Sequence, residues 1–310
     1  MKESTLHHWR GLVEKAIAIT DNNMSQDLSV TDVAAQLSVD AQTLGRRFED
    51  LKQESFKQFT RRRKLENAGG LLRHSSFSIS QIADLCGYTN SAALSKAFSQ
   101  DLHFSPTAYR DRPCLVNEDE TLYRTKIITS AEDEMMSDIF CMDNTEEINL
   151  PSSTLYYVLL PSQNDPIRNM VTFMEHFIQE FSIIKSTVFL QDAKIITGTL
   201  DAVPVTLYHR MMMYVGLLVP NGPGYEKVHR QMQFMGLYAC TLHTKDIAGN
   251  SYKHLKVNMG FAEAGLPMYN FINHSCRVGY FKMTSNQFFI SLTGRNTCEV
   301  FIPCEKRYGC

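Results

Sequence analysis

Apolar residues recur at helical spacing along the first third of the chain. Leu6, Trp9 and Val13 lie three and four positions apart and predict an amphipathic helix near the start of the chain. Helical spacing continues to about residue 112. From residue 151 the pattern changes to short runs rich in β-branched and aromatic residues, such as TLYYVLL and FFISLTG, which are typical of strands. The pattern predicts an all-α domain over residues 1–113 and an α+β domain over residues 151–310.

Helical segments interrupt the predicted strands of the second domain. Met170, Phe173 and Phe177 lie three and four positions apart and predict one helix, and HLKVNMGFAEAGL indicates another. The order strand, helix, strands therefore occurs twice and predicts two related halves. Residues 114–150 lack this periodicity and contain the acidic run NEDE, so we expect a linker or a flexible loop there, with room for one strand.

Two stretches about 50 residues apart repeat one pattern of apolar and polar residues. They are VAAQLSVDAQTLGRRF, residues 33–48, and IADLCGYTNSAALSKAF, residues 82–98. SVTD and SISQ precede them, and both resemble the capping box that begins a helix. Ser38 and Gly87 fall in the predicted turns, where glycine permits a positive φ. Each repeat is thus predicted to be a helix-turn-helix motif.

The second helix of each repeat is predicted to be apolar on one face and polar on the other. Leu44, Phe48, Leu94 and Phe98 form the apolar faces and are expected in the core. An α-helix fits the DNA major groove, where Arg, Gln, Ser and Thr can contact base edges. The candidate base-reading residues are Gln42, Thr43, Arg46, Arg47, Ser91, Ala92, Ser95 and Lys96.

The segment FKQFTRRRKLENAGGLLRH is predicted to be a helix that connects the two motifs. About 20 helical residues span about 30 Å, close to the roughly 34 Å of one DNA turn. Its cations Arg61, Arg62, Arg63 and Lys64 have two interpretations of similar weight, a solvated and salt-bridged face or phosphate contact. Their place between two motifs favours phosphate contact for one or two of them. The later pair of glycines, residues 69–70, indicates either close packing or a flexible angle between the motifs.

The second repeat carries the pattern I-x-x-I-A-x-x-x-G-Y, then L-x-x-x-F, then S-P-x-x-Y-R. Over residues 5–113 the chain resembles the DNA-binding domain of the AraC/XylS family of transcription regulators. This resemblance implies an activator that binds an asymmetric promoter site, with its motifs in successive major grooves, and that works with RNA polymerase. It also implies that the closing helix approaches the DNA backbone, which makes Thr107 and Arg110 candidate phosphate contacts.

Residues 267–304, with PMYN near the start and CEVFIPC at the end, resemble a GyrI-like effector-binding domain. The resemblance implies an antiparallel sheet built from two pseudo-repeated strand-helix-strand-strand modules, with a small hydrophobic effector bound between them. The segment VGYFK lacks the acid that such domains often use for a cationic ligand. The candidate effector-binding residues are Tyr156, Tyr214, Tyr238, Tyr280 and Phe281.

Charge and cysteine usage narrow the function further. Residues 1–113 carry 15 Lys and Arg against 13 Asp and Glu, and residues 151–310 carry 14 against 10, whereas residues 114–150 carry 2 against 10. Such mild basicity is compatible with nucleic acid. The eight cysteines are scattered without a C-x-x-C pair, and no nucleotide-binding or hydrolase motif occurs. We therefore expect free thiols, no metal, no cofactor and no enzymatic activity.

The first residues do not form a secretory signal. The longest apolar run of the whole sequence, MMMYVGLLV, is too short to span a bilayer. We therefore expect a cytoplasmic, nucleoid-associated protein. Two alternatives stay open. An architectural or origin-binding protein would use the same helices with low sequence selectivity, and a ligand-processing enzyme would use the second domain.

Overall fold

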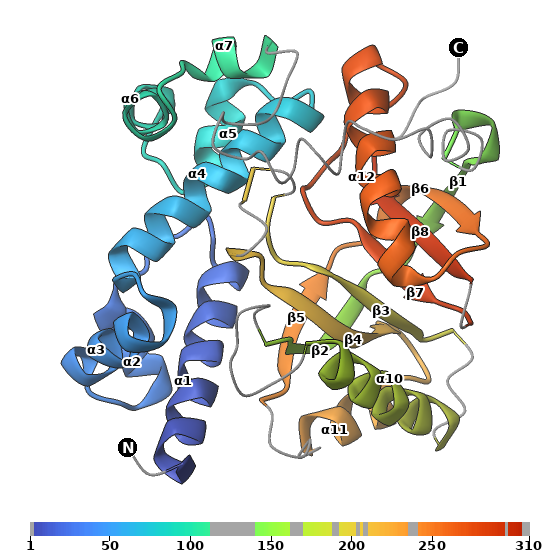
Figure 1. The fold of residues 1–310 in the computed structure, drawn as a ribbon, viewed down its shortest axis with the longest axis horizontal. Helices are drawn as coiled ribbons and strands as arrows, with labels where there is room; N and C mark the ends of the chain where they lie inside the picture. The colour runs from blue at the N-terminus through green and yellow to red at the C-terminus, as the bar shows by residue number, and fades with distance from the viewer. Residues whose placement is uncertain are drawn as a thin grey trace.

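The computed structural model describes residues 3–111, 140–161, 170–187, 192–202, 205–206, 210–234, 241–294 and 297–305. A helical part and a sheet part lie side by side, with the long helix α4 between the outer helices and the sheet (Figure 1). The predicted helical N-terminal part and antiparallel α+β C-terminal part are both confirmed. Most of the expected linker lies outside the described residues.

The helical part consists of seven helices whose starts are fixed by local sequence. Ser29, Ser55 and Ser78 each cap a helix within a complete capping box. Asp40 and Asn90 accept hydrogen bonds from the backbone N–H groups of Thr43 and Ala93. The helices are α1 Glu3–Asn22, α2 Val30–Leu37, α3 Ala41–Lys52, α4 Phe56–His74, α5 Ile79–Leu85, α6 Ser91–Leu102 and α7 Pro106–Asp111.

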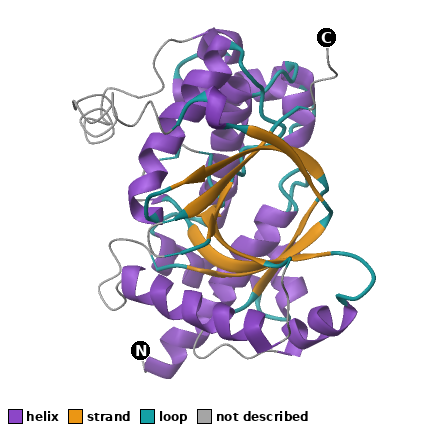
Figure 2. Cartoon of the chain, turned by 90° about the vertical axis from the view of Figure 1, so that its right-hand side faces the viewer, coloured by secondary structure: helices purple, strands orange, loops and turns teal. Residues whose placement is uncertain are grey.

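The sheet part holds one eight-stranded antiparallel sheet that curls into a half-barrel (Figure 2). Its order is β1-β6-β8-β7-β3-β4-β2-β5, and the central contact joins β3 to β7 through pairs such as Thr197 and Ile290. The strands are β1 Glu146–Leu150, β2 Ser153–Leu159, β3 Lys194–Thr199, β4 Met213–Pro220, β5 His243–Ile247, β6 Asn250–Val257, β7 Phe289–Leu292 and β8 Cys298–Pro303. The helices are the 3-10 turn η1 Met142–Asn144, α10 Met170–Thr187, α11 Glu226–Phe234 and α12 Phe261–Val278.

The sheet begins earlier in the chain than the pattern indicates. Strand β1 lies inside the segment expected as a linker and pairs with β6, with Ile148 opposite Tyr252. Glu146 and Glu147 make its sequence acidic, and an edge strand tolerates such charge because one side faces solvent. This strand agrees with the single strand that the acidic segment allows.

The two faces of the sheet have different partners. One face packs under α12 through Ile272 and Val300 and under α10 and α11 through Phe177 and Val228. The other, which we call the aromatic face, bears Tyr157, Tyr214, Tyr252, Phe289 and Phe301. These five side chains belong to the same buried cluster as Val33, Leu44 and Phe59 of the helical part. The two parts of the molecule thus share one apolar core.

Helix α4 packs closely against the sheet part at its paired glycines. A Cβ on Gly69 would lie 3.0 Å from Cγ1 of Val205. A Cβ on Gly70 would lie 2.9 Å from Cβ of Ala202 and would overlap the side-chain amide of Asn286. Of the two interpretations of this pair, close packing is the one that the geometry favours.

We expect Gly70→Ala to lower the free energy of unfolding by about 1–3 kcal/mol, because the added methyl group forces α4 away from Ala202 and Asn286. Gly45→Ala, in α3, is the matched control: its Cβ would meet only Val30 at an ordinary 3.9 Å, so alanine should stabilise that helix by about 0.5–1 kcal/mol. Chemical denaturation measures both variants. A Gly70→Ala protein as stable as the wild type would contradict the close packing.

Candidate nucleic-acid interface

Helices α3 and α6 show the same sequence of buried and exposed positions, 50 residues apart. Leu44 and Phe48 in α3 and Leu94 and Phe98 in α6 have no solvent exposure, as their spacing predicts. The residues between them alternate in the same order of half-buried and exposed side chains in both helices. Each helix therefore turns the corresponding face outward.

The outward faces hold the predicted base-reading residues. Gln42, Arg46, Ala92 and Lys96 are exposed. In Figure 1, α3 and α6 both lie on the side of α4 that faces away from the sheet. The sheet part therefore leaves both faces open. The half-buried members of the set are Thr43, Arg47, Ser91 and Ser95.

Hydrogen bonds and ion pairs divide these residues into engaged and free side chains. The hydroxyl of Thr43 donates to the cap carboxylate of Asp40 at 2.7 Å, and this bond lowers the pKa of Asp40. Arg47 pairs with Asp50 at 3.3 Å and lies 5.9 Å from the ring of Trp9. Among the described residues Arg46 is exposed and has no ion-pair partner, so its guanidinium is free for a ligand.

The basic segment, residues 61–64, sends its four cations to different neighbours. Arg61 makes a bidentate pair with Asp101 of α6, at 2.6 and 3.0 Å. Arg62 pairs with Glu54 at 2.5 Å and with Glu66 at 2.9 Å. The segment therefore ties α4 to its surroundings.

Arg63 and Lys64 complete these ties. Arg63 is 3% exposed and donates to Asp21 at 2.8 Å, to the carbonyl of Leu200 at 2.8 Å and to Asp201. Lys64 pairs with Asp27 at 2.8 Å. The expectation of phosphate contact therefore fails for Arg63, whose charge is buried among carboxylates. Arg61, with its side chain 49% exposed, is the member of the segment most accessible to DNA.

The two candidate phosphate residues of α7 differ in role. Thr107 is exposed at the first turn of that helix. Arg110 is half-buried and donates to the carbonyls of Leu72 and Phe77, at 3.2 and 2.5 Å. Arg110 thus fastens α7 to the end of α4, and its donors are occupied there.

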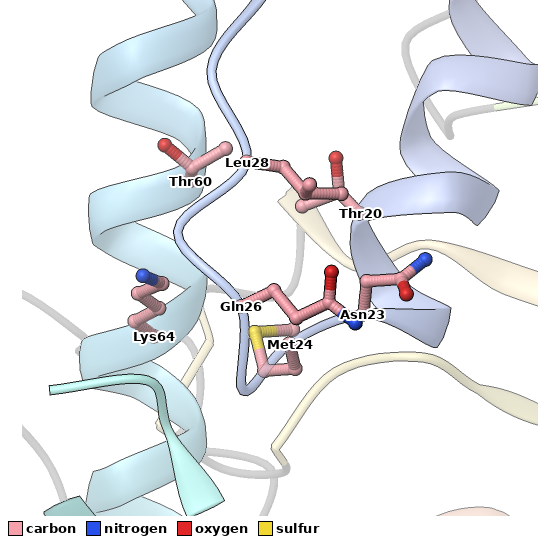
Figure 3. Close-up of a pocket in the computed structure, with 7 residues that line it drawn as sticks. All are labelled: Thr20, Asn23, Met24, Gln26, Leu28, Thr60 and Lys64. Carbon is pink, nitrogen blue, oxygen red and sulfur yellow. The ribbon is translucent and has the colours of Figure 1, made fainter. Parts of the chain in front are cut away.

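The first helix pair, α2 and α3, and the second helix pair, α5 and α6, meet at the turn between α5 and α6, which contacts the loop before α2. Gly87 has φ of +68°, and a Cβ there would lie 2.8 Å from the carbonyl oxygen of Ser25 and 2.9 Å from that of Met24. Lys64 also reaches the carbonyl of Gly87, at 3.3 Å. Figure 3 shows the loop before α2 beside α4 at this junction, where a pocket has room for about one water molecule. Its lining includes Thr20, Asn23, Met24, Gln26, Leu28, Thr60 and Lys64.

The candidate effector residues do not share one surface. Tyr156 lies under α11 and bonds Nδ1 of His229 at 2.7 Å, whereas Tyr214 lies on the aromatic face. Phe281 is buried under α12, and Tyr280 is 48% exposed at the end of that helix. Tyr238 lies outside the described residues.

Sequence reasoning missed the aromatic face and the acid Glu299 on it. Glu299 lies near Phe301 on β8 and pairs with Lys194 at 3.2 Å, and the rings of His254 and Phe301 make a tilted contact with 4.9 Å between their centroids. Successive residues in CEVFIP point to opposite faces of the strand, so Glu299 and Phe301, two positions apart, share one face, and this alternation is the signal that could have located them together.

Other kinds of site are missing from the part of the chain that the structure describes. No three His, Cys, Asp or Glu side chains gather there in a way that could hold a metal ion. Within the same ranges, no helix has both the length and the apolar character to cross a lipid bilayer.

Comparison with known proteins bears on the helical part. Residues 33–112 match the family model HTH_18, a helix-turn-helix domain. This part of the chain is a helix-turn-helix domain. The regulatory protein PocR of Salmonella typhimurium is 29% identical over 100 residues, which cover 32% of this chain and 33% of that protein. The HTH-type transcriptional activator RhaS of Klebsiella pneumoniae is 30% identical over 98 residues, 32% of this chain and 35% of RhaS.

The similarity to solved structures has the same extent. The C-terminal domain of AraT, a response regulator from Geobacillus stearothermophilus, is 30% identical with a TM-score of 0.32, covering 34% of this chain and 88% of that one. The matched segment spans about a third of the length of the curated relatives. The helix-turn-helix prediction is thus confirmed for residues 33–112, and the GyrI-like resemblance stays a prediction.

We expect Gly87→Ala to destabilise the protein by more than the roughly 1–2 kcal/mol that a positive φ alone costs a residue with a Cβ, because the methyl group also meets the backbone of residues 24–25. Gly279→Ala is the matched control, since Gly279 has φ of +83° and no atom lies within 4 Å of its added Cβ. Denaturation followed by the fluorescence of Trp9, the one tryptophan of the chain, measures both. Equal losses of unfolding free energy in the two variants would mean that the backbone of residues 24–25 accommodates the added methyl group at little cost.

Proposed function

We propose that this protein is a sequence-specific DNA-binding transcription regulator, and an activator. The observation that carries the proposal is the pair of matching exposed faces on α3 and α6, two helices that lie on the same side of α4, with Arg46 and Lys96 exposed on them. The regulators among its relatives, two of them named as transcriptional activators, support this choice.

The dimensions of the helical part suit two successive major grooves. A helix of 19 residues such as α4 is about 28 Å long, close to the roughly 34 Å between grooves on one face of DNA. Both helices that would enter grooves belong to one chain and differ in sequence. A single protein would therefore occupy one asymmetric promoter site.

We assign the proposed roles from the exposure of each side chain and from the contacts that it already makes. Gln42, Arg46, Ala92 and Lys96 would contact base edges directly, with Thr43, Arg47, Ser91 and Ser95 at their flanks. Arg61 and Thr107, both accessible, would contact phosphate. Arg62, Lys64 and Arg110 would act by holding the helices in place.

The sheet part would modulate DNA binding through a small hydrophobic effector or a protein partner, with RNA polymerase as a second partner of the complex. The aromatic face carries the apolar rings that are typical of such sites, and because the helical part buries it, an effector would have to enter between the two parts of the molecule. Glu299 would be its polar group.

The test starts from a DNA site enriched by the full-length protein from a pool of random duplexes. We expect Arg46→Ala to weaken binding to the enriched site by about 1–3 kcal/mol and to weaken binding to random DNA much less. Arg230→Ala, an equally exposed arginine on α11 far from α3, is the matched control and should change neither affinity. Titrations at one fixed salt concentration measure both.

Two outcomes would contradict the proposal in different ways. Equal losses on enriched and random DNA would remove the base-reading role of Arg46. Failure to enrich any sequence, despite tight binding, would favour an architectural protein of low selectivity.

A further inference from the structure

One face of α4 is attached to the sheet part along most of the helix. Arg63 donates to Asp201, Thr206 donates to Glu66 at 2.8 Å, and Asn286 donates to the carbonyl of Asn67 at 2.8 Å. Gly70 packs on Ala202, and the N–H of Met283 donates to the carbonyl of His74 at 2.7 Å. Positions 63, 66 and 70, like positions 63, 67, 70 and 74, follow one another at spacings of three and four, so all five share one helix face.

Asp201 is the centre of this attachment on the side of the sheet. Its side chain has no solvent exposure and accepts hydrogen bonds from Arg63, from the hydroxyl of Thr199 at 3.0 Å and from the N–H of Met212. Arg63 also pairs with Asp21 of α1, and Asp21 pairs with Lys245 of β5. Two cations and two carboxylates therefore neutralise one another where α1, α4 and the sheet meet.

Such a network fixes the position of α4 on the sheet more strictly than apolar packing does. A buried charge that loses its partner is strongly unfavourable, so α4 cannot slide or rotate against the sheet without breaking Arg63–Asp201. The helix needs this support, because Gly69 and Gly70 weaken it between the two helix pairs. The contact between the pairs themselves is small, and Asp27, the partner of Lys64 there, is almost fully exposed.

We propose that Asp201 and Arg63 are positioning residues through which the sheet part sets the separation and angle of α3 and α6, and hence the spacing of the DNA site. This inference rests on the proposed function. A protein that holds its two DNA-contacting helices rigidly binds the two halves of a site at one spacing, whereas a protein that holds them flexibly accepts several spacings. One inserted base pair turns the second half by about 34°, because a full turn takes 10–10.5 base pairs.

The experiment uses the full-length protein and three duplexes. The first is the site enriched by the wild type, the second has one base pair inserted between its halves, and the third keeps only one half. The variant is Asp201→Asn, which keeps the size of the side chain and removes its charge. The control is Glu147→Gln, which breaks the pair with Lys253 at the far edge of the same sheet.

We expect Asp201→Asn to lower the affinity ratio between the enriched and the inserted duplex by about tenfold, because the helices can then adjust to the insertion. Affinity for the single half should not change, and Glu147→Gln should leave all three affinities as they are. A loss of stability alone would lower every affinity by the same factor. A folded Asp201→Asn protein with the wild-type ratio would overturn the inference.

A second variant keeps the inference testable if Asp201→Asn does not fold, as judged by Trp9 fluorescence and circular dichroism. Thr206→Val removes only the hydroxyl that reaches Glu66, whose carboxylate stays paired with Arg62. It should lower the same ratio by a smaller factor, and an unchanged ratio would overturn the inference. Failure of the wild type to enrich any site would instead defeat the proposed function.

Discussion

The burial of one guanidinium governs how this molecule is assembled. Burial would lower the pKa of Arg63, but the carboxylates of Asp201 and Asp21 outweigh it and raise that pKa, so the side chain stays charged. A charge without water must be matched by ions of opposite sign. Those ions come from α1 and from the end of β3, 42 and 138 residues away. The helix between the two helix pairs, the first helix and the sheet therefore all meet at this one charge.

Local signals were enough to place the helices of the N-terminal part. Leu44, Phe48, Leu94 and Phe98 are buried as their spacing predicted, and the capping residues begin their helices as expected, because each of these effects acts within a few residues. The ion-pair partners of residues 61–64 could not be predicted from local signals. Their partners are up to 138 residues distant, and a run of cations looks alike whether it faces phosphate or distant carboxylates.

The sheet part illustrates a different limit. Tyr156 and Tyr157 are neighbours in sequence, yet they belong to different cores because successive strand residues point to opposite faces. Choosing the face that each occupies requires the register of β2 with β4 and β5, which no short pattern contains. The candidate effector residues were therefore grouped by type rather than by face. The sequence allows one strand in the acidic segment, but the acids of β1 mask the alternation that would give its position.

The core shared by the first helix pair and the aromatic face has a consequence for biosynthesis. The second pair has a cluster of its own, closed by residues between Leu65 and Tyr109, so it can become compact soon after it leaves the ribosome. The cluster of the first pair extends to Phe301. At about 5–20 residues per second, the 138 residues from Arg63 to Asp201 take about 7–28 seconds to synthesise. The half of the DNA-binding domain that is translated first is thus completed last.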